Sequence, residues 1–140
     1  MSKVKLKGGK AEALLAKELW RKGYRYRKND KRLPGSPDIA ISRYHIAVFV
    51  DGEFWHGYDW EERKLRLKTN RDYWIEKIEE NIARDLRNDQ RLIQMGWIPL
   101  HFWEKTVLKK LDSCVTAVEE TILSQITAQI AGEETPESDL

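Results

Sequence analysis

Apolar residues recur every three or four positions in three stretches of the chain, which is the spacing of amphipathic helices. The first helix is predicted over residues 11–22 and the third over residues 107–130. The second begins at Thr69 or Asn70 and ends before Gly96. The apolar positions expected to be buried are Leu15 and Leu19 in the first helix, Ile75, Ile78, Ile82, Leu86 and Ile93 in the second, and Val107, Leu111, Val115, Val118, Ile122 and Ile126 in the third.

Four runs rich in β-branched and aromatic residues predict β-strands. They cover residues 24–27, 38–42, 44–51 and 97–103. Only a short turn at Arg43 separates the second run from the third, so we expect these two strands to pair as an antiparallel hairpin. The third run is almost entirely apolar, which is typical of a central strand covered on both faces.

The predicted order is helix, sheet, helix, strand, helix, which indicates an α/β fold with a small mixed sheet flanked by helices on both faces. A polar and basic segment, residues 57–68, is expected to be a loop. The 140 residues suffice for one domain, which we place at residues 10–132. Residues 1–9 are predicted to be a flexible basic arm and residues 133–140 a disordered acidic tail, because neither has enough apolar content to offset the entropy cost of ordering.

The amino-acid composition indicates in which compartment the protein works and what it binds. No apolar run approaches the ~20 residues that span a bilayer, so we expect a soluble protein of the cytoplasm. The single cysteine, Cys114, is predicted to be a small buried hydrophobe. The last eight residues carry four acids and no base, so the rest of the chain is more basic than the net charge of +2 suggests. A polyanion partner is one interpretation, and a solubilising basic surface is the other.

Two aspartates stand at the ends of the predicted hairpin. Asp38 follows Pro37 where one strand begins, and Asp51 ends the next strand, followed by Gly52 and Glu53. In an antiparallel hairpin both carboxylates lie at the same end, where their mutual repulsion favours a divalent cation between them. Mg²⁺, which binds carboxylates together with water and phosphate oxygens, would suit phosphodiester hydrolysis. The alternative is that both aspartates are ordinary turn residues.

An imidazole and two aromatic rings follow directly on the second aspartate. The pKa of a histidine lies near neutrality, which suits His56 to take a proton from an attacking water. His45 and His101 are interpreted instead as ordinary core or surface residues. Phe54 and Trp55 either belong to the core or, if exposed, stack on bases.

Three segments resemble the very-short-patch repair endonucleases in sequence, order and spacing. They are LPGSPDIAI at residues 33–41, VFVDGEFWHG at residues 48–57 and YWIEKIEENIARDLRNDQRLIQMGWIPLHFWE at residues 73–104, and the span from the first to the last covers about half of the chain. The FWH triplet and the GW strand that ends in WE make the resemblance specific. It implies a restriction-endonuclease-like three-layer fold of the PD-(D/E)xK type, and an enzyme that nicks DNA beside the thymine of a T:G mismatch.

The resemblance also implies roles for individual residues. Asp38 matches the metal-binding aspartate that follows proline, and His56 matches the histidine proposed as general base. Glu12 falls where the family has an acid near the active site, and Asp85 matches an acid that supports the region of the catalytic histidine. The aromatic residues that the family inserts into DNA beside the mismatch are matched by Phe54, Trp55 and Trp74.

The chain departs from the family at the catalytic strand and at the zinc site. Where the family commonly has Thr-His-Gly-Cys, residues 50–53 read Val-Asp-Gly-Glu, which restores the D-x-E form of some restriction enzymes. This favours a magnesium site built from Asp38, Asp51 and Glu53. The family's zinc ligands are missing, since Glu53 replaces a cysteine, the segment GYDWEERK contains no His or Cys, and Lys105 follows the WE. We therefore expect no structural zinc.

Together these features predict a Mg²⁺-dependent endodeoxyribonuclease that acts on double-stranded DNA at the nucleoid, with DNA repair proteins as further partners. A restriction-like nuclease without mismatch preference is one alternative, and a DNA-binding module of the same fold without catalysis is another. The predicted catalytic residues are Asp38, Asp51, Glu53, His56, Glu12 and Asp85, and the basic residues predicted to contact DNA beside the aromatic ones are Arg63, Lys64, Arg66 and Lys68.

Overall fold

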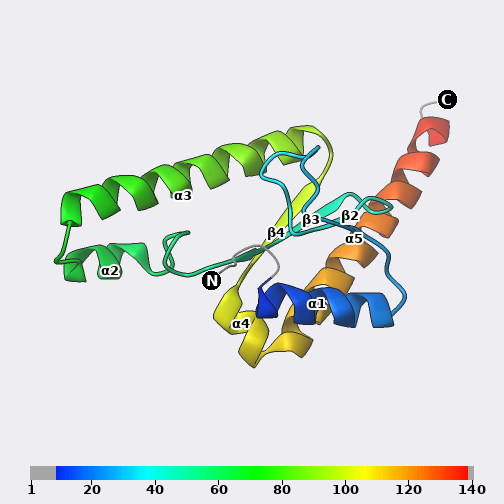
Figure 1. The fold of residues 1–140 in the computed structure, drawn as a ribbon. Helices are drawn as coiled ribbons and strands as arrows, with labels where there is room; N and C mark the ends of the chain where they lie inside the picture. The colour runs from blue at the N-terminus through cyan, green and yellow to red at the C-terminus, as the bar shows by residue number, and fades with distance from the viewer. Residues whose placement is uncertain (1–8, 139–140) are drawn as a thin grey trace.

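A four-stranded sheet lies between two layers of helices in the computed structural model, which describes the backbone of residues 9–138 and the side chains of residues 9–132. Helix α3 lies on one side of the sheet, and α1 and α5 lie on the other (Figure 1). The predicted α/β class with a small mixed sheet is confirmed. The elements in chain order are α1 (Lys10–Arg21), β1 (Arg27–Lys28), β2 (Ile39–Ile41), β3 (Ile46–Asp51), α2 (Trp60–Arg66), α3 (Arg71–Gln94), β4 (Ile98–Trp103), α4 (Glu104–Lys109) and α5 (Leu111–Ser138).

The strands follow the order β1-β2-β3-β4 across the sheet. Strands β1, β2 and β3 pair antiparallel, which confirms the predicted hairpin, whereas β4 runs parallel to β3. The parallel register places Asp51 opposite Trp103, so the carboxyl ends of β3 and β4 lie side by side. In open α/β sheets, ligand sites commonly lie just beyond the carboxyl ends of parallel strands.

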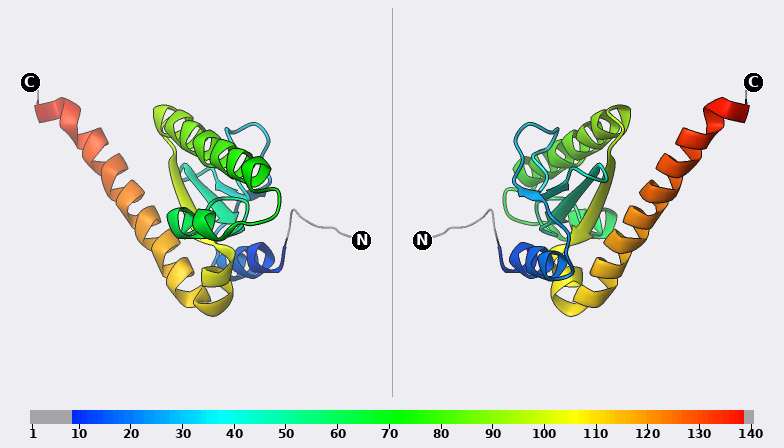
Figure 2. Two further views of the ribbon diagram at one scale, coloured as in Figure 1. Left: turned by 90° about the vertical axis from the view of Figure 1, so that its left-hand side faces the viewer. Right: turned by 90° about the vertical axis from the view of Figure 1, so that its right-hand side faces the viewer.

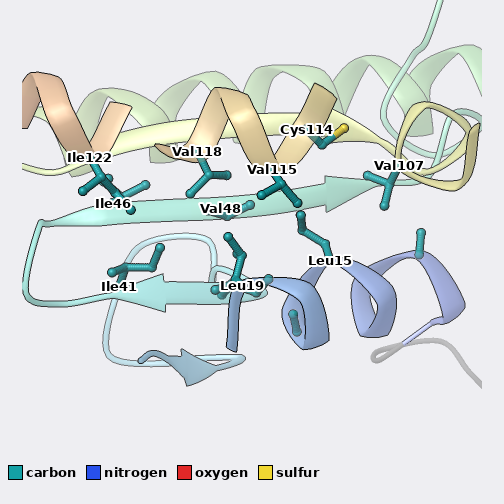
Figure 3. Packing of buried hydrophobic residues seen from close by; sticks show 13 residues of the cluster. Leu15, Leu19, Ile41, Ile46, Val48, Val107, Cys114, Val115, Val118 and Ile122 are labelled. Carbon is teal, nitrogen blue, oxygen red and sulfur yellow. The ribbon is translucent and has the colours of Figure 1, made fainter. Parts of the chain in front are cut away.

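Alternate residues of β3 face opposite layers, as in any extended strand. Ile46 and Val48 point into the larger core, which α1 and α5 complete (Figure 3). The buried positions predicted for the first helix are confirmed, and so are the central ones of the last. The residues of α1 and α5 buried in this core include Leu15, Leu19, Cys114, Val115, Val118 and Ile122.

The other residues of β3 face α3 across a smaller core. Ala47 and Phe49 pack there with Leu92 of α3. Asp51 continues the same alternation, so it faces α3 where the apolar residues stop, and only 7% of it is exposed. The smaller core therefore ends at a buried carboxylate.

The apolar stripe predicted for α3 is wrong in its second half. Leu86 and Ile93 are 59% and 60% exposed, whereas Ile78, Asn81 and Leu92 are buried. Residues three and four positions apart share one side of a helix, so the buried side runs from Ile78 through polar positions to Leu92. A stripe chosen for apolar character alone follows the wrong side of the helix here.

Residues 57–68 are not the loop that the sequence predicted, because α2 forms within them. The sequence of α2, WEERKLR, consists largely of strong helix formers. The indole N–H of Trp60 donates to Glu79 of α3 at 3.0 Å, and Nζ of Lys64 lies 3.4 Å from the same carboxylate. These contacts tie α2 to α3, so the polar composition indicated exposure but not the local conformation.

The helix predicted over residues 107–130 is broken into two. Helix α4 ends at Lys109 and α5 begins at Leu111, because Lys110 leaves the helical conformation with φ −134° and ψ 54°. The far end of α5 projects from the rest of the molecule (Figure 2). The backbone is helical to Ser138, where a disordered acidic tail was predicted, and residues 139–140 lie outside the described part.

Strand β1 is shorter than predicted and starts later. Tyr24 and Tyr26 lie before it, and their hydroxyls donate to Glu119 at 2.8 Å and to the carbonyl of Ala16 at 2.7 Å. These bonds hold the segment against α5 and α1, so the pairing with β2 begins only at Arg27.

Two further predictions concern the ends of the chain and membranes. The predicted basic arm, residues 1–9, lies almost entirely outside the described residues. None of the helices that the structure describes is long and apolar enough to cross a membrane.

Candidate active site

A chain of carboxylates and imidazoles begins at the buried end of β3. Oδ2 of Asp51 lies 2.7 Å from Nδ1 of His101, and its Oδ1 lies 4.0 Å from Nδ1 of His56. His101 belongs to the neighbouring strand β4, and His56 to the loop after β3. Each imidazole also contacts an aspartate of α3: His56 contacts Asp85, and His101 contacts Asp89. We call these five residues the Asp–His network.

His56 is held through one ring nitrogen. Its Nδ1 lies 2.6 Å from Oδ2 of Asp85. This hydrogen bond raises the pKa of His56 above its usual value against the effect of burial, and the nearby charge of Asp51 adds to the rise. In the neutral ring the Nδ1 proton donates to Asp85, which leaves the lone pair on Nε2. No described residue forms a hydrogen bond with Nε2, so this atom is suited to accept a proton.

His101 is held through both ring nitrogens. Nδ1 contacts Asp51, and Nε2 lies 2.8 Å from each carboxylate oxygen of Asp89. The ring also stacks on Phe49, with centroids 4.6 Å apart and planes 8° from parallel. Burial acts to lower the pKa of His101, but the hydrogen bonds to Asp51 and Asp89 outweigh it and raise the pKa to about 9. The ring is therefore a cation that donates both of its N–H groups.

Asp38 lies at the same end of the sheet as Asp51. The backbone N–H of Val50 donates to Oδ2 of Asp38 at 2.7 Å, so this carboxylate reaches the residue directly before Asp51. Asp38 is buried, and it follows the buried Pro37, whose fixed φ restricts the backbone at the entry to β2. The two predicted aspartates are thus brought to one end of the hairpin.

Glu53 does not join the two aspartates. Its Oε2 accepts a hydrogen bond at 2.8 Å from the backbone N–H of Lys105 in the first turn of α4, where helix N–H groups lack partners within the helix. Among the described residues, no group of three or more His, Cys, Asp or Glu side chains is placed to hold a metal ion. The predicted three-carboxylate set of Asp38, Asp51 and Glu53 is therefore not assembled.

Glu12 lies in a different layer from the Asp–His network. It is 4% exposed on α1, across the sheet from α3, and its Oε2 lies 3.2 Å from Nζ of Lys28 in β1. An ion pair that compensates a buried carboxylate accounts for the place of Glu12 on the buried side of its helix.

Phe54, Trp55 and Trp74 form an aromatic cluster. Each pair of rings meets edge to face, with centroids 5.1 to 5.5 Å apart. The side-chain amide of the buried Asn81 donates to the carbonyl of Trp55 at 3.0 Å, which fixes the cluster to α3. Trp55 is 48% exposed, so the cluster offers aromatic surface to a partner. The structure thus brings together the three aromatic residues that the resemblance assigned to DNA.

A cleft of about 760 Å³ extends from Gly52 along the aromatic cluster to α2. Arg63 and Arg66, two of the predicted DNA contacts, line it, and Arg63 also lies over a ring of the cluster. Lys64 instead forms an ion pair with Glu79 of α3, and Lys68 is exposed beyond the end of α2. The four basic residues therefore divide into two that line the cleft and two that do not.

His101 and Asp89 were not predicted as site residues from the sequence. A signal for Asp89 was its place four residues after Asp85, since that spacing puts both carboxylates on one side of a helix. His101 follows from the register of β4, which pairs it with Phe49 and so sets it beside Asp51. That register joins strands separated by all of α3, and no local sequence pattern reveals it.

Comparison with known proteins identifies several relatives. Residues 1–62 match the family model described as DNA mismatch endonuclease Vsr. The type II nicking enzyme V.HpaIIP of Haemophilus parainfluenzae is 50% identical over 84% of this chain and 84% of its own. The type II nicking enzyme V.NmeDIP of Neisseria meningitidis serogroup C is 48% identical over 87% of this chain and 82% of its own. The DNA mismatch endonuclease Vsr of Escherichia coli is 38% identical over 66% of this chain and 59% of its own.

Proposed function

Because this chain belongs to the Vsr family of DNA mismatch endonucleases, we propose that it nicks double-stranded DNA at or beside T:G mismatches with the help of Mg²⁺. The chain is a DNA endonuclease, as its relatives are. We extend that activity to a mismatch preference, a metal ion and a role for each residue of the site.

The contact between His56 and Asp85, beside the carboxylate of Asp51, carries the proposal. Nε2 of His56 takes a proton from the water that attacks the phosphodiester. Asp85 holds the ring in orientation through Nδ1 and stabilises the imidazolium that results. A positioned general base of this kind contributes about 10²–10⁴-fold to a rate.

The charge of the site suits a divalent cation. It holds four carboxylates, on Asp38, Asp51, Asp85 and Asp89, against two imidazoles. Within the described part of the chain, the last three of these aspartates form ion pairs only with histidine. A local excess of carboxylate charge is stabilised by a hard cation. We assign Mg²⁺ to Asp38 and Asp51, where its ligands would include water and phosphate oxygens and its charge would acidify a water and offset that of the phosphate.

The aromatic cluster of Phe54, Trp55 and Trp74 is assigned to the mismatch. Inserting aromatic side chains between bases costs a few kcal/mol of unstacking per step. A mismatched step is already poorly paired, so the cost is smaller there. The exposed face of Trp55 and the arginines of the adjoining cleft support an approach of the duplex from this side.

A single-turnover cleavage assay on two duplexes of one sequence, one with a T:G mismatch and one fully paired, tests this function. We expect wild-type protein to nick the T:G duplex faster in Mg²⁺ and to nick neither duplex in EDTA. Asp38→Asn and Asp51→Asn keep the side-chain volume but remove the charge, so they should abolish cleavage and leave DNA binding, measured by fluorescence anisotropy, largely intact. Asp112→Asn, at the exposed start of α5, is the matched control and should cleave normally.

Each other result points to a different conclusion. Equal rates on the two duplexes would leave a restriction-like nuclease without mismatch preference. Near wild-type cleavage by Asp38→Asn or Asp51→Asn would refute the metal site. Binding of DNA by wild-type protein without cleavage would favour a DNA-binding module.

A further inference from the structure

We propose that His101 is a positioning residue for Asp51, and that Asp89 in turn holds His101. The inference rests on the proposed function, since it assumes that Asp51 takes part in cleavage. It assigns a role to two residues that lie behind the reacting groups, on β4 and α3.

The ring of His101 is fixed from three sides. Asp51 accepts from one nitrogen at 2.7 Å, Asp89 accepts from the other at 2.8 Å, and Phe49 stacks on the ring face. A rotation of the ring would break at least two of these contacts. Both nitrogens are occupied, so His101 has no atom left to bind a substrate and acts only through Asp51.

The fold does not need a histidine at this position. Residue 101 pairs with Phe49 at the edge of the smaller core of Ala47, Phe49 and Leu92, and 31% of the His101 side chain is exposed. Only the Asp51 carboxylate of the pair is buried, and replacing buried ion pairs by apolar residues is often neutral or stabilising, so packing alone does not call for this pair. Ionisable side chains that packing does not require are found most often at functional sites.

The hydrogen bond from His101 sets the orientation of the Asp51 carboxylate. The N–H of His101 holds Oδ2, which leaves Oδ1 directed toward His56 at 4.0 Å. Without that bond, the carboxylate of Asp51 is free to rotate and to close the remaining gap to His56. A direct contact between Asp51 and His56 would compete with the bond between His56 and Asp85, and would turn the Asp51 carboxylate away from the orientation that it has in the site.

Two amide substitutions separate the bonds of His101. The amide nitrogen of asparagine falls near the position of Nδ1, and that of glutamine falls near the position of Nε2. His101→Asn therefore keeps a donor for Asp51 and loses the one for Asp89, whereas His101→Gln does the reverse. His45→Asn, at the opposite end of β3 where the ring stacks on Trp97, is the matched control.

We expect His101→Gln to lower the single-turnover rate about 10- to 100-fold, the range typical of residues that orient a functional ligand from behind. His101→Asn should restore most of that rate, His45→Asn should equal wild type, and none of the three should change the dissociation constant for DNA. In the metal-free protein, NMR of the ring N–H protons should show two exchange-protected signals for His101, of which Asp51→Asn shifts the Nδ1 signal more. Equal rates for His101→Gln and His101→Asn, or no loss in His101→Gln, would overturn the inference.

Asp89→Ala keeps the test decisive if His101→Gln does not fold. Asp89 lies on α3 with a side chain 23% exposed, and alanine favours the helix. The variant should cleave more slowly than wild type at unchanged DNA affinity, and an unchanged rate would refute the role of Asp89. An inactive Asp51→Asn beside fully active variants of His101 and Asp89 would refute only this inference, whereas a fully active Asp51→Asn would refute it together with the proposed function.

Discussion

Replacing Trp74 with alanine should separate recognition of a mismatch from packing of the protein. Trp74 is half-buried at the start of α3, one turn before the buried Ile78. Its ring contacts the rings of Phe54, Trp55 and Tyr73. Both a base-inserting residue and a core residue would occupy such a place, so the two roles need different measurements.

The structure sets the size of each effect. The three ring contacts of Trp74 have centroids 5.0 to 5.5 Å apart. Aromatic pairs contribute about 0.5–1.5 kcal/mol each, so losing three lowers the free energy of unfolding by about 1.5–4.5 kcal/mol. A T:G step that saves about 1.4 kcal/mol of unstacking corresponds to a tenfold preference for the mismatched duplex. Trp74→Ala should bring that preference close to one.

Two assays on the same variant decide between the roles. Urea unfolding gives the loss of stability, and single-turnover cleavage of T:G and paired duplexes gives the ratio of rates. Trp97→Ala is the matched control, because Trp97 is also half-buried but packs beside Leu92 and His45, away from the aromatic cluster. It should lose stability and keep the ratio.

A role in recognition requires that the ratio of rates falls in Trp74→Ala by more than the affinity for paired DNA. A destabilised variant with an unchanged ratio would show that Trp74 is only a packing residue, and the reasoning from the aromatic cluster would be wrong. A fall of the ratio in Trp97→Ala as well would refute it equally, since general loss of stability would then explain both variants.

Three other outcomes are expected. DNA affinity should fall steeply with salt, and Arg66→Ala should reduce the slope of log affinity against log salt concentration by about 1. Lys64→Ala should leave that slope nearly unchanged, because Lys64 is paired with Glu79. Equal slopes for the two variants would contradict this assignment. Asp85→Asn should slow cleavage about 10- to 100-fold, because a hydrogen bond to a charged group contributes about 1.5–3 kcal/mol. The same variant should move the acidic limb of the pH–rate profile to lower pH, because the bond to Asp85 is the main cause of the raised pKa of His56. Elemental analysis should find no stoichiometric zinc after dialysis against a mild chelator, and one zinc per chain would refute that prediction.

The sequence predicted the parts of the fold that depend on local pattern. The long helix α3, the hairpin of β2 and β3, and the apolar residues of α1 and α5 were all visible as periodic runs. Errors arose where contacts between distant segments decide the conformation. The segment before β1 is held by α1 and α5, and α2, although rich in helix formers, is also held by Glu79 of α3.

The candidate site was predicted in the same uneven way. Asp51 and His56 are five residues apart and follow one strand, so their proximity is legible in the sequence. Asp85 came only from the resemblance, and Glu53 was assigned to the metal although its carboxylate turns to the N–H of Lys105. The D-x-E spacing predicts which residues lie near the strand end, but the free N–H groups at the start of the distant helix α4 decide where the second acid points.

The two largest errors meet at one interface. The buried side of α3 was misplaced because it carries polar residues such as Asp85 and Asp89. His101 was interpreted as an ordinary residue although it lies on β4 and contacts Asp89. Apolar patterning finds a core only where packing alone selects the residues. Between α3 and the ends of β3 and β4, partly buried carboxylates and imidazoles are instead held by hydrogen bonds to one another. The failure of the pattern at this interface is therefore itself a sign that function, and not packing, selected these residues.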